Sequence, residues 1–168
     1  MPANNKTSLV AVVMGSDSDL PIMQSCIDQL KYFKIDPIVR IISAHRTPDI
    51  AADFADNADK NGIKVIIAAA GMAAHLAGSL AARTYLPIIG VPLAAPTGPN
   101  GLDALLSTVQ MPPGIPVAAV AIGKAGAKNA AILAVQMLAL SDNDMKQKLI
   151  AFRTEQSNAV IEKDASIQ

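Results

Sequence analysis

The chain has 168 residues, of which 51% are hydrophobic, and its 14 Lys plus Arg balance its 14 Asp plus Glu. This length suits one domain with a buried core, and the balanced charge excludes a global field that would attract nucleic acid or an anionic membrane. We therefore interpret residues 1–168 as a single domain with a core at about 8–140, and we expect neither nucleic acid nor a membrane as a partner.

In chain order, the expected elements alternate between strands and helices. Short apolar runs rich in Val and Ile indicate buried parallel strands, because each run is too continuous for a half-exposed strand. These runs cover residues 9–14, 37–42, 65–70, 88–91 and 117–122. Apolar residues at helical spacing predict a helix over 20–33, and a second helix over 48–61 has Thr47 as its N-cap and Pro48 at its first position. This alternation predicts a three-layer α/β/α fold, a flavodoxin-like open parallel sheet of about five strands with helices on both faces.

Two further helical segments close the chain, and the second of them is a C-terminal helical extension. Residues 125–140 are apolar nearly all round, so we expect this helix to be buried between subunits. Residues 142–166 carry only a thin apolar stripe among charged side chains. The stripe consists of Met145, Leu149, Phe152 and Val160. It predicts that this helix docks either on a neighbouring subunit or on its own domain.

The beginning of the chain and its cysteine content bear on the compartment. The first residues, MPANNKTS, lack a basic stretch followed by a long apolar one, and no apolar run approaches the roughly 20 residues of a membrane helix. Cys26 is the only cysteine, so the chain can form no internal disulfide. We therefore expect a cytoplasmic protein.

Polar residues concentrate where the predicted strands end. In open α/β sheets, ligands bind outside the carboxyl ends of the strands, where loops converge and helix N-termini offer free N–H groups. The segments at these positions are GSDSD (15–19), SAHRTP (43–48), GMAAH (71–75), the loop 92–101 and GKAG (123–126). We therefore predict the functional site at this edge of the sheet.

Both histidines of the chain, His45 and His75, belong to this set. A histidine beside a core can be a hydrogen-bonded packing residue. Because both histidines of the chain lie at predicted strand ends, a functional role is favoured. An imidazole can donate or accept a proton near neutral pH, so His45 is the candidate general acid and base. No carboxylate or cysteine stands at a recognised ligand spacing from the histidines, so we expect no metal.

GSDSD and Arg46 together suggest an anionic ligand. Gly15 allows close backbone approach, Ser16 and Ser18 offer hydroxyls, and a helix begins directly afterwards. Plain helix capping by Ser18 or Asp19 is the alternative explanation. Arg46 can grip a phosphate bidentately, whereas a carboxylate repels one, so we assign Asp19 to a sugar hydroxyl. A phosphorylated small molecule is the predicted ligand.

The motifs GSDSD, SAHRTP, GMAAH and GLDALLSTVQMPPGIPVAAVAIGKAGAKNAAILA resemble, in order and spacing, the N5-carboxyaminoimidazole ribonucleotide mutase family of de novo purine synthesis. The resemblance implies transfer of a carboxylate from an exocyclic nitrogen to the adjacent carbon of an imidazole ribonucleotide, without metal or organic cofactor. It further implies a homo-octamer and a separate ATP-dependent synthetase that supplies the substrate. His45 matches the general acid/base, and Ser16, Asp19 and Arg46 match the main substrate-binding positions. Secondary positions are Gly15, Ser18, Ser43, Ala70, Gly71, Ala73, Ala74 and His75.

Some residues depart from the family pattern, and two alternative functions stay open. Where the family commonly has GAGGAAHLPG, this chain carries Ala69, Met72 and Ala77, and its loop 93–100 lacks a serine and is one residue longer. A second branch carboxylates aminoimidazole ribonucleotide directly with carbon dioxide. That branch typically has Lys-Gly after SAH, where this chain has Arg-Thr. The other alternative is a ribonucleotide-binding module without catalysis.

Overall fold

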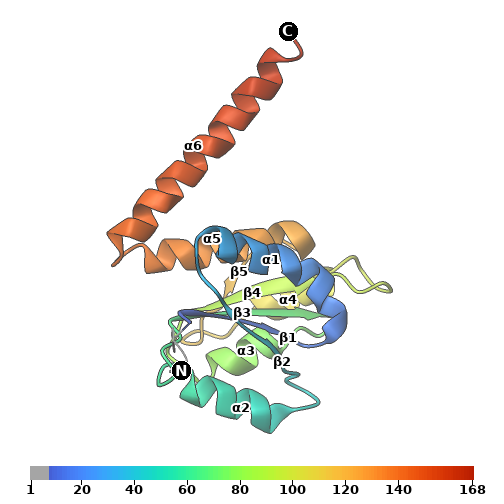
Figure 1. The fold of residues 1–168 in the computed structure, drawn as a ribbon. Coiled ribbons are helices and arrows are strands. Elements are labelled where there is room, and N and C mark those ends of the chain that lie inside the picture. The colour runs from blue at the N-terminus through green and yellow to red at the C-terminus, as the bar shows by residue number, and fades with distance from the viewer. Residues whose placement is uncertain (1–7) are drawn as a thin grey trace.

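The computed structural model describes residues 8–168, and this part of the chain folds into five strands and six α-helices (Figure 1). The strands are β1 (Val10–Met14), β2 (Ile38–Ile41), β3 (Val65–Gly71), β4 (Ile88–Leu93) and β5 (Ala118–Ala119). The helices are α1 (Leu20–Tyr32), α2 (Pro48–Asn57), α3 (Leu76–Ala81), α4 (Leu102–Val109), α5 (Gly123–Leu138) and α6 (Asn143–Ala165), with a short 3₁₀ turn, η1 (Asp17–Asp19), before α1. All strand pairs are parallel, in the order β2-β1-β3-β4-β5. The predicted flavodoxin-like order is confirmed.

The sheet separates two apolar cores because side chains of a strand alternate between its faces. In β1, Val10, Val12 and Met14 join the core beneath α1 and α5, whereas Ala11 and Val13 join the core beneath α2 and α3. All five side chains of β1 are buried. We predicted from its continuous apolar run that this strand is buried on both faces, and this prediction is confirmed.

Two strands that were predicted to be buried are partly exposed to solvent. β2 lies at one edge of the sheet, and Val39 and Ile41 are exposed, 40% and 54% respectively. β5, at the other edge, is only two residues long and half-buried. The prediction that 37–42 and 117–122 are buried strands is wrong, because an edge strand has only one neighbour to cover it.

The apolar helix α5 is covered largely by its own chain. It begins and ends two residues earlier than expected and packs against α1, β4 and α6. Its buried residues include Ala127, Ala130, Ala131 and Ala134. Contact is close enough that a Cβ on Gly126 would lie 1.6 Å from the Ala121 carbonyl oxygen. Small side chains thus let α5 pack closely against its neighbours. The burial of this helix between subunits stays a prediction.

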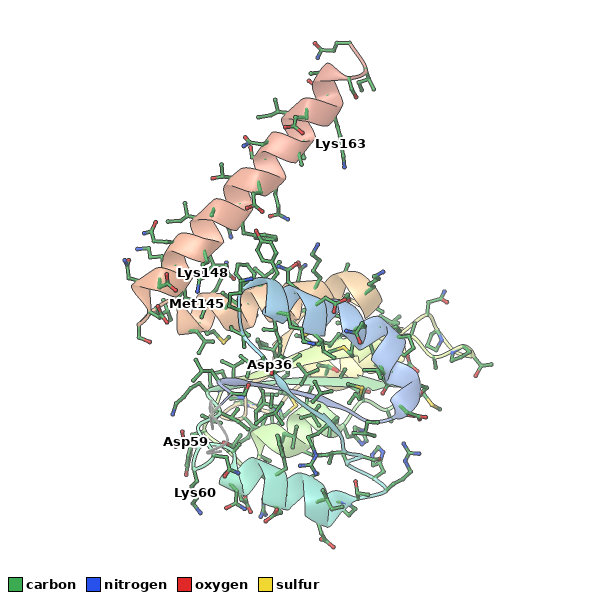
Figure 2. The ribbon with its side chains drawn as sticks, in the orientation of Figure 1. Asp36, Asp59, Lys60, Met145, Lys148 and Lys163 are labelled. Carbon is green, nitrogen blue, oxygen red and sulfur yellow. The ribbon has the colours of Figure 1, made fainter. Side chains whose placement is uncertain are left out.

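Helix α6 docks on its own domain only through its first half. The Asp142 side chain caps the helix by accepting from the Met145 N–H at 3.0 Å, and Met145, Leu149 and Phe152 are buried. The Phe152 ring lies edge-on to those of Tyr32 and Phe33. Beyond this cluster the helix projects away from the body, with Met145 at its foot and Lys163 near its far end (Figure 2). Docking of α6 on its own domain is confirmed for its first half. In the second half Val160, the last residue of the expected apolar stripe, is 67% exposed.

Candidate active site

The carboxyl ends of β2, β1 and β3 bring three of the predicted segments side by side. The Gly15 N–H donates to the Ala69 carbonyl at 3.2 Å, and the Ile42 N–H donates to the Met14 carbonyl at 2.9 Å. The loops 15–19, 43–48 and 71–75 therefore start from adjacent points on the sheet. The fifth segment, GKAG, instead forms the first turn of α5 after the edge strand β5.

The two histidines contact each other directly. His45 Nε2 lies 2.8 Å from His75 Nδ1, and the rings meet edge-on with centroids 4.9 Å apart. Both side chains are exposed, so neither is a buried packing residue. Only one hydrogen fits between the facing nitrogens, so one ring must donate while the other accepts.

A capping box closes the GSDSD turn. The Asp19 carboxylate accepts from the Ser16 N–H at 3.1 Å, and the Ser16 hydroxyl accepts from the Ser18 N–H at 3.3 Å and from the Ser18 hydroxyl at 2.9 Å. Ser16 caps the 3₁₀ turn η1, whereas Asp19, one of the two residues suggested by the sequence, holds the N-cap position of α1 without a side-chain capping bond. The Ser16 hydroxyl donates to the Asp17 carboxylate at 3.0 Å, so both amides and both hydroxyl hydrogens of Ser16 and Ser18 are engaged within the turn. An anion is bound here only when a hydroxyl turns from its present partner to the ligand.

The Asp19 carboxyl is partly buried in this turn. Partial burial raises its pKa above the ordinary value. The backbone N–H groups of Ser16 and Gly15 and the positive charge of Arg46 oppose this effect without cancelling it. A carboxylate that has lost part of its hydration is a strong acceptor for a ligand hydroxyl.

Arg46 joins two of the loops. Its Nη2 donates to the Gly15 carbonyl at 2.7 Å, and its backbone N–H donates to the Ser43 hydroxyl at 3.1 Å. Thr47 occupies the N-cap position of α2, but its hydroxyl exchanges hydrogen bonds with the Ser43 backbone, at 3.0 Å each, and does not cap the helix. The predicted N-cap position of Thr47 is confirmed, but its hydroxyl makes no capping bond because a local side chain–backbone turn competes for it. The same turn places Arg46 over GSDSD.

The loop after β3 is short and tightly built. A Cβ on Gly71 would lie 3.2 Å from the Leu93 carbonyl oxygen, and the His75 N–H donates to the Ala73 carbonyl at 2.8 Å. Ala74 is buried, and Ala73 is exposed. Met72 adopts a left-handed backbone conformation with φ of 56°. The sequence marks this residue only as a departure from glycine and gives no signal for its conformation.

A hollow on the described residues lies away from this edge of the sheet. A cavity of about 700 Å³ is lined by 81–88 and 114–116 together with Ala118 and Met137, at the amino ends of β4 and β5. It contains neither histidine nor any residue of GSDSD. Between residues 8 and 168, no three His, Cys, Asp or Glu side chains are grouped so that they could hold a metal ion. None of the helices in this part of the chain combines the length and apolarity needed to cross a membrane.

Fold and site together define an α/β protein with an imidazole pair, a guanidinium and a hydroxyl-rich turn at the carboxyl edge of its sheet. The chain belongs to the AIR carboxylase family, which it matches over residues 9–159.

Similar proteins cover nearly the whole chain. The N5-carboxyaminoimidazole ribonucleotide mutase of Haemophilus influenzae is 51% identical over 158 residues, which is 94% of this chain and 96% of that protein. The protein of the same name from Escherichia coli (strain K12) is 48% identical over 96% of this chain and 95% of its own length. The crystal structure of Treponema denticola PurE aligns with a TM-score of 0.86 at 28% identity, covering 96% of this chain and 99% of that one.

Proposed function

We propose that this protein is an N5-carboxyaminoimidazole ribonucleotide mutase that forms 4-carboxy-5-aminoimidazole ribonucleotide in purine biosynthesis. The observation that carries the proposal is the identity of about half the residues, over almost the full length, to several proteins of that name. The contact between His45 and His75 supports it, because the reaction needs a group that both gives and takes a proton.

The proposed chemistry uses His45 twice. Protonated His45 gives its proton to the exocyclic nitrogen as the nitrogen–carboxyl bond breaks, and the bonding electrons stay on that nitrogen. Carbon dioxide is released next to the ring. The electron-rich ring carbon then attacks carbon dioxide and forms the new carbon–carbon bond. His45 removes the hydrogen from that carbon, which restores the aromatic ring and returns His45 to its protonated state. No external acid or base is consumed.

The other side chains hold the ribonucleotide in place. Arg46 binds the phosphate together with the hydroxyls of Ser16 and Ser18, which turn from their bonds to Asp17 and Ser16 to donate to the ligand. The half-buried Asp19 carboxylate accepts a ribose hydroxyl. The remaining proposed contacts are Gly15, Ser43, Ala70, Gly71, Ala73, Ala74 and His75. The small residues of this set let the backbone close around carbon dioxide and exclude water.

The assembly and cellular setting belong to the same proposal. The protein is a cytoplasmic homo-octamer that receives its unstable substrate from an ATP-dependent synthetase. The far half of α6 supports a larger assembly, because Val160 and Ile161 are 67% and 62% exposed. Apolar side chains on a helix that projects from its own domain gain burial only against another chain.

The test follows ultraviolet absorbance after wild-type protein is mixed with N5-carboxyaminoimidazole ribonucleotide. We expect carboxyaminoimidazole ribonucleotide to form with wild type. His45→Asn should abolish turnover, because an amide cannot carry the proton, while product binding measured by calorimetry largely survives. Equal thermal midpoints of the two proteins would show that the substitution leaves the fold intact.

A parallel reaction contains aminoimidazole ribonucleotide and low bicarbonate. Product formed there at a comparable rate would assign the protein to direct carboxylation. Binding without product in either reaction would leave a ribonucleotide-binding module. Turnover retained by His45→Asn would remove His45 from the chemistry.

A further inference from the structure

Met72 combines two features that are unfavourable in the folded chain. Its φ of 56° lies in the left-handed region, where the Cβ of an L-residue crowds the following carbonyl oxygen. Its side chain is also 63% exposed, so this large apolar group gains little from burial. Strain of this kind persists where the surrounding structure imposes it, and such residues cluster at functional sites.

The other left-handed residues outside glycine have ordinary explanations. Among residues 8–168 these are Lys34 and Asn100. Lys34 follows the last turn of α1 and donates its N–H to the Lys31 carbonyl at 2.9 Å, which is a common way for a helix to end. Asparagine tolerates this conformation better than most residues. Met72 follows a strand and has neither explanation.

The position of Met72 points to the reacting end of the site. Gly71 before it packs against the Leu93 carbonyl, and His75 after it contacts His45. Ala73 and Ala74 contribute only methyl groups. Met72 is therefore the one long side chain in the loop between the end of β3 and the histidine pair.

We propose that Met72 is the apolar cover of the carbon dioxide pocket, a positioning residue that closes over the bound imidazole ring during turnover. This inference rests on the proposed mutase function. Carbon dioxide has no charge and donates no hydrogen bond, so its retention depends on a closed apolar enclosure more than on polar contacts. A thioether side chain is flexible and fits irregular apolar surfaces, including the face or edge of an aromatic ring.

The experiment measures how much carbon dioxide escapes between the two steps. Substrate labelled with ¹³C in its carboxyamino group is converted in a single turnover, with enzyme in excess and unlabelled bicarbonate present. The label retained in the product is then measured by mass spectrometry. Carbon dioxide that leaves the site is diluted by the unlabelled pool. We expect wild type to retain most of the label and Met72→Gly to lose several-fold more of it.

Two variants serve as controls. Met72→Leu keeps an apolar side chain of similar volume and should retain label close to the wild-type level. Lys34→Gly replaces a residue of the same backbone conformation at the end of α1 and should change label retention no more than the experimental error. Met72→Gly is expected to fold, because glycine adopts positive φ without strain.

Equal label retention by wild type and Met72→Gly, with both turning over, would overturn the role of Met72. So would equal label loss by Met72→Leu and Met72→Gly. Absence of product with wild type would instead refute the proposed mutase function, so the two failures are distinguishable.

Discussion

Replacing Gly90 by alanine tests the packing that holds α4 against the sheet. A Cβ at this position in β4 would lie 2.3 Å from Thr108 Cγ2, 3.0 Å from Val117 Cγ1 and 3.4 Å from Ala77 Cβ. Carbon atoms in ordinary contact are about 3.5 Å apart, so Thr108 must yield by about 1.2 Å, the difference between about 3.5 and 2.3 Å.

Overpacking of this kind costs about 1–3 kcal/mol of unfolding free energy. For a chain of this size, that corresponds to a loss of about 2–12 °C in thermal midpoint. The assay is urea unfolding followed by circular dichroism at one fixed protein concentration, because any assembly makes the apparent stability depend on concentration.

Thr108→Ser supplies the decisive comparison, because it deletes the clashing methyl. The hydroxyl, which donates to the Ala104 carbonyl at 2.7 Å, is retained. Alone, this substitution should cost about 1 kcal/mol for the lost buried methyl. In Gly90→Ala/Thr108→Ser the new methyl occupies the vacated space, so we expect a favourable coupling of at least about 1 kcal/mol.

Thr108→Val keeps the methyl and removes the hydroxyl, so it should not rescue Gly90→Ala. If the changes in unfolding free energy caused by Gly90→Ala and Thr108→Ser simply add in the double variant, Thr108 Cγ2 is not the atom that excludes a side chain at position 90.

Three further predictions concern α6 and the site. Phe152→Ala should weaken the docking of α6 by about 3 kcal/mol and accelerate amide exchange in that helix; unchanged exchange would contradict the aromatic anchor. Burial raises the pKa of Asp19, so its carboxylate destabilises the fold increasingly as pH rises from the unfolded value of 3.8 through the higher folded value. The stability gain of Asp19→Asn over wild type should therefore grow from pH 3.5 to pH 7 in denaturant titrations, and a constant difference would refute this. Met72→Gly should raise the unfolding free energy by about 0–1.6 kcal/mol, because it relieves about 1–2 kcal/mol of left-handed strain and adds about 0.4–1 kcal/mol of chain entropy to the unfolded state. A lower thermal midpoint than wild type would contradict the strain.

Local patterns were sufficient to predict most of the fold. The apolar runs at 9–14, 65–70 and 88–91 correspond closely to the three central strands, and the sheet has the expected order. The runs at 37–42 and 117–122 look the same in the sequence but lie at the two edges of the sheet. Apolar composition does not reveal how many neighbours a strand has, so their exposure could not be predicted.

The location of the candidate site was also predictable from the sequence, whereas its hydrogen bonds were not. Strand ends in parallel order predict that GSDSD, SAHRTP and GMAAH meet, and the structure brings these loops together. Their internal bonding was not predictable. The Ser16–Asp19 capping box and the bond between Arg46 and the Gly15 carbonyl depend on side-chain rotamers and on the exact paths of two loops.

The sequence by itself determined the alternation of strands and helices, the edge of the sheet that carries the polar residues, and the family. It did so because periodicity and short motifs are local properties of the chain. Only the tertiary structure decided that the two histidines contact each other, that Met72 has a left-handed backbone, and that α6 buries no residue beyond Phe152. These features arise from distances between residues far apart in sequence or from backbone angles that neighbouring elements impose, and neither is encoded in residue spacing.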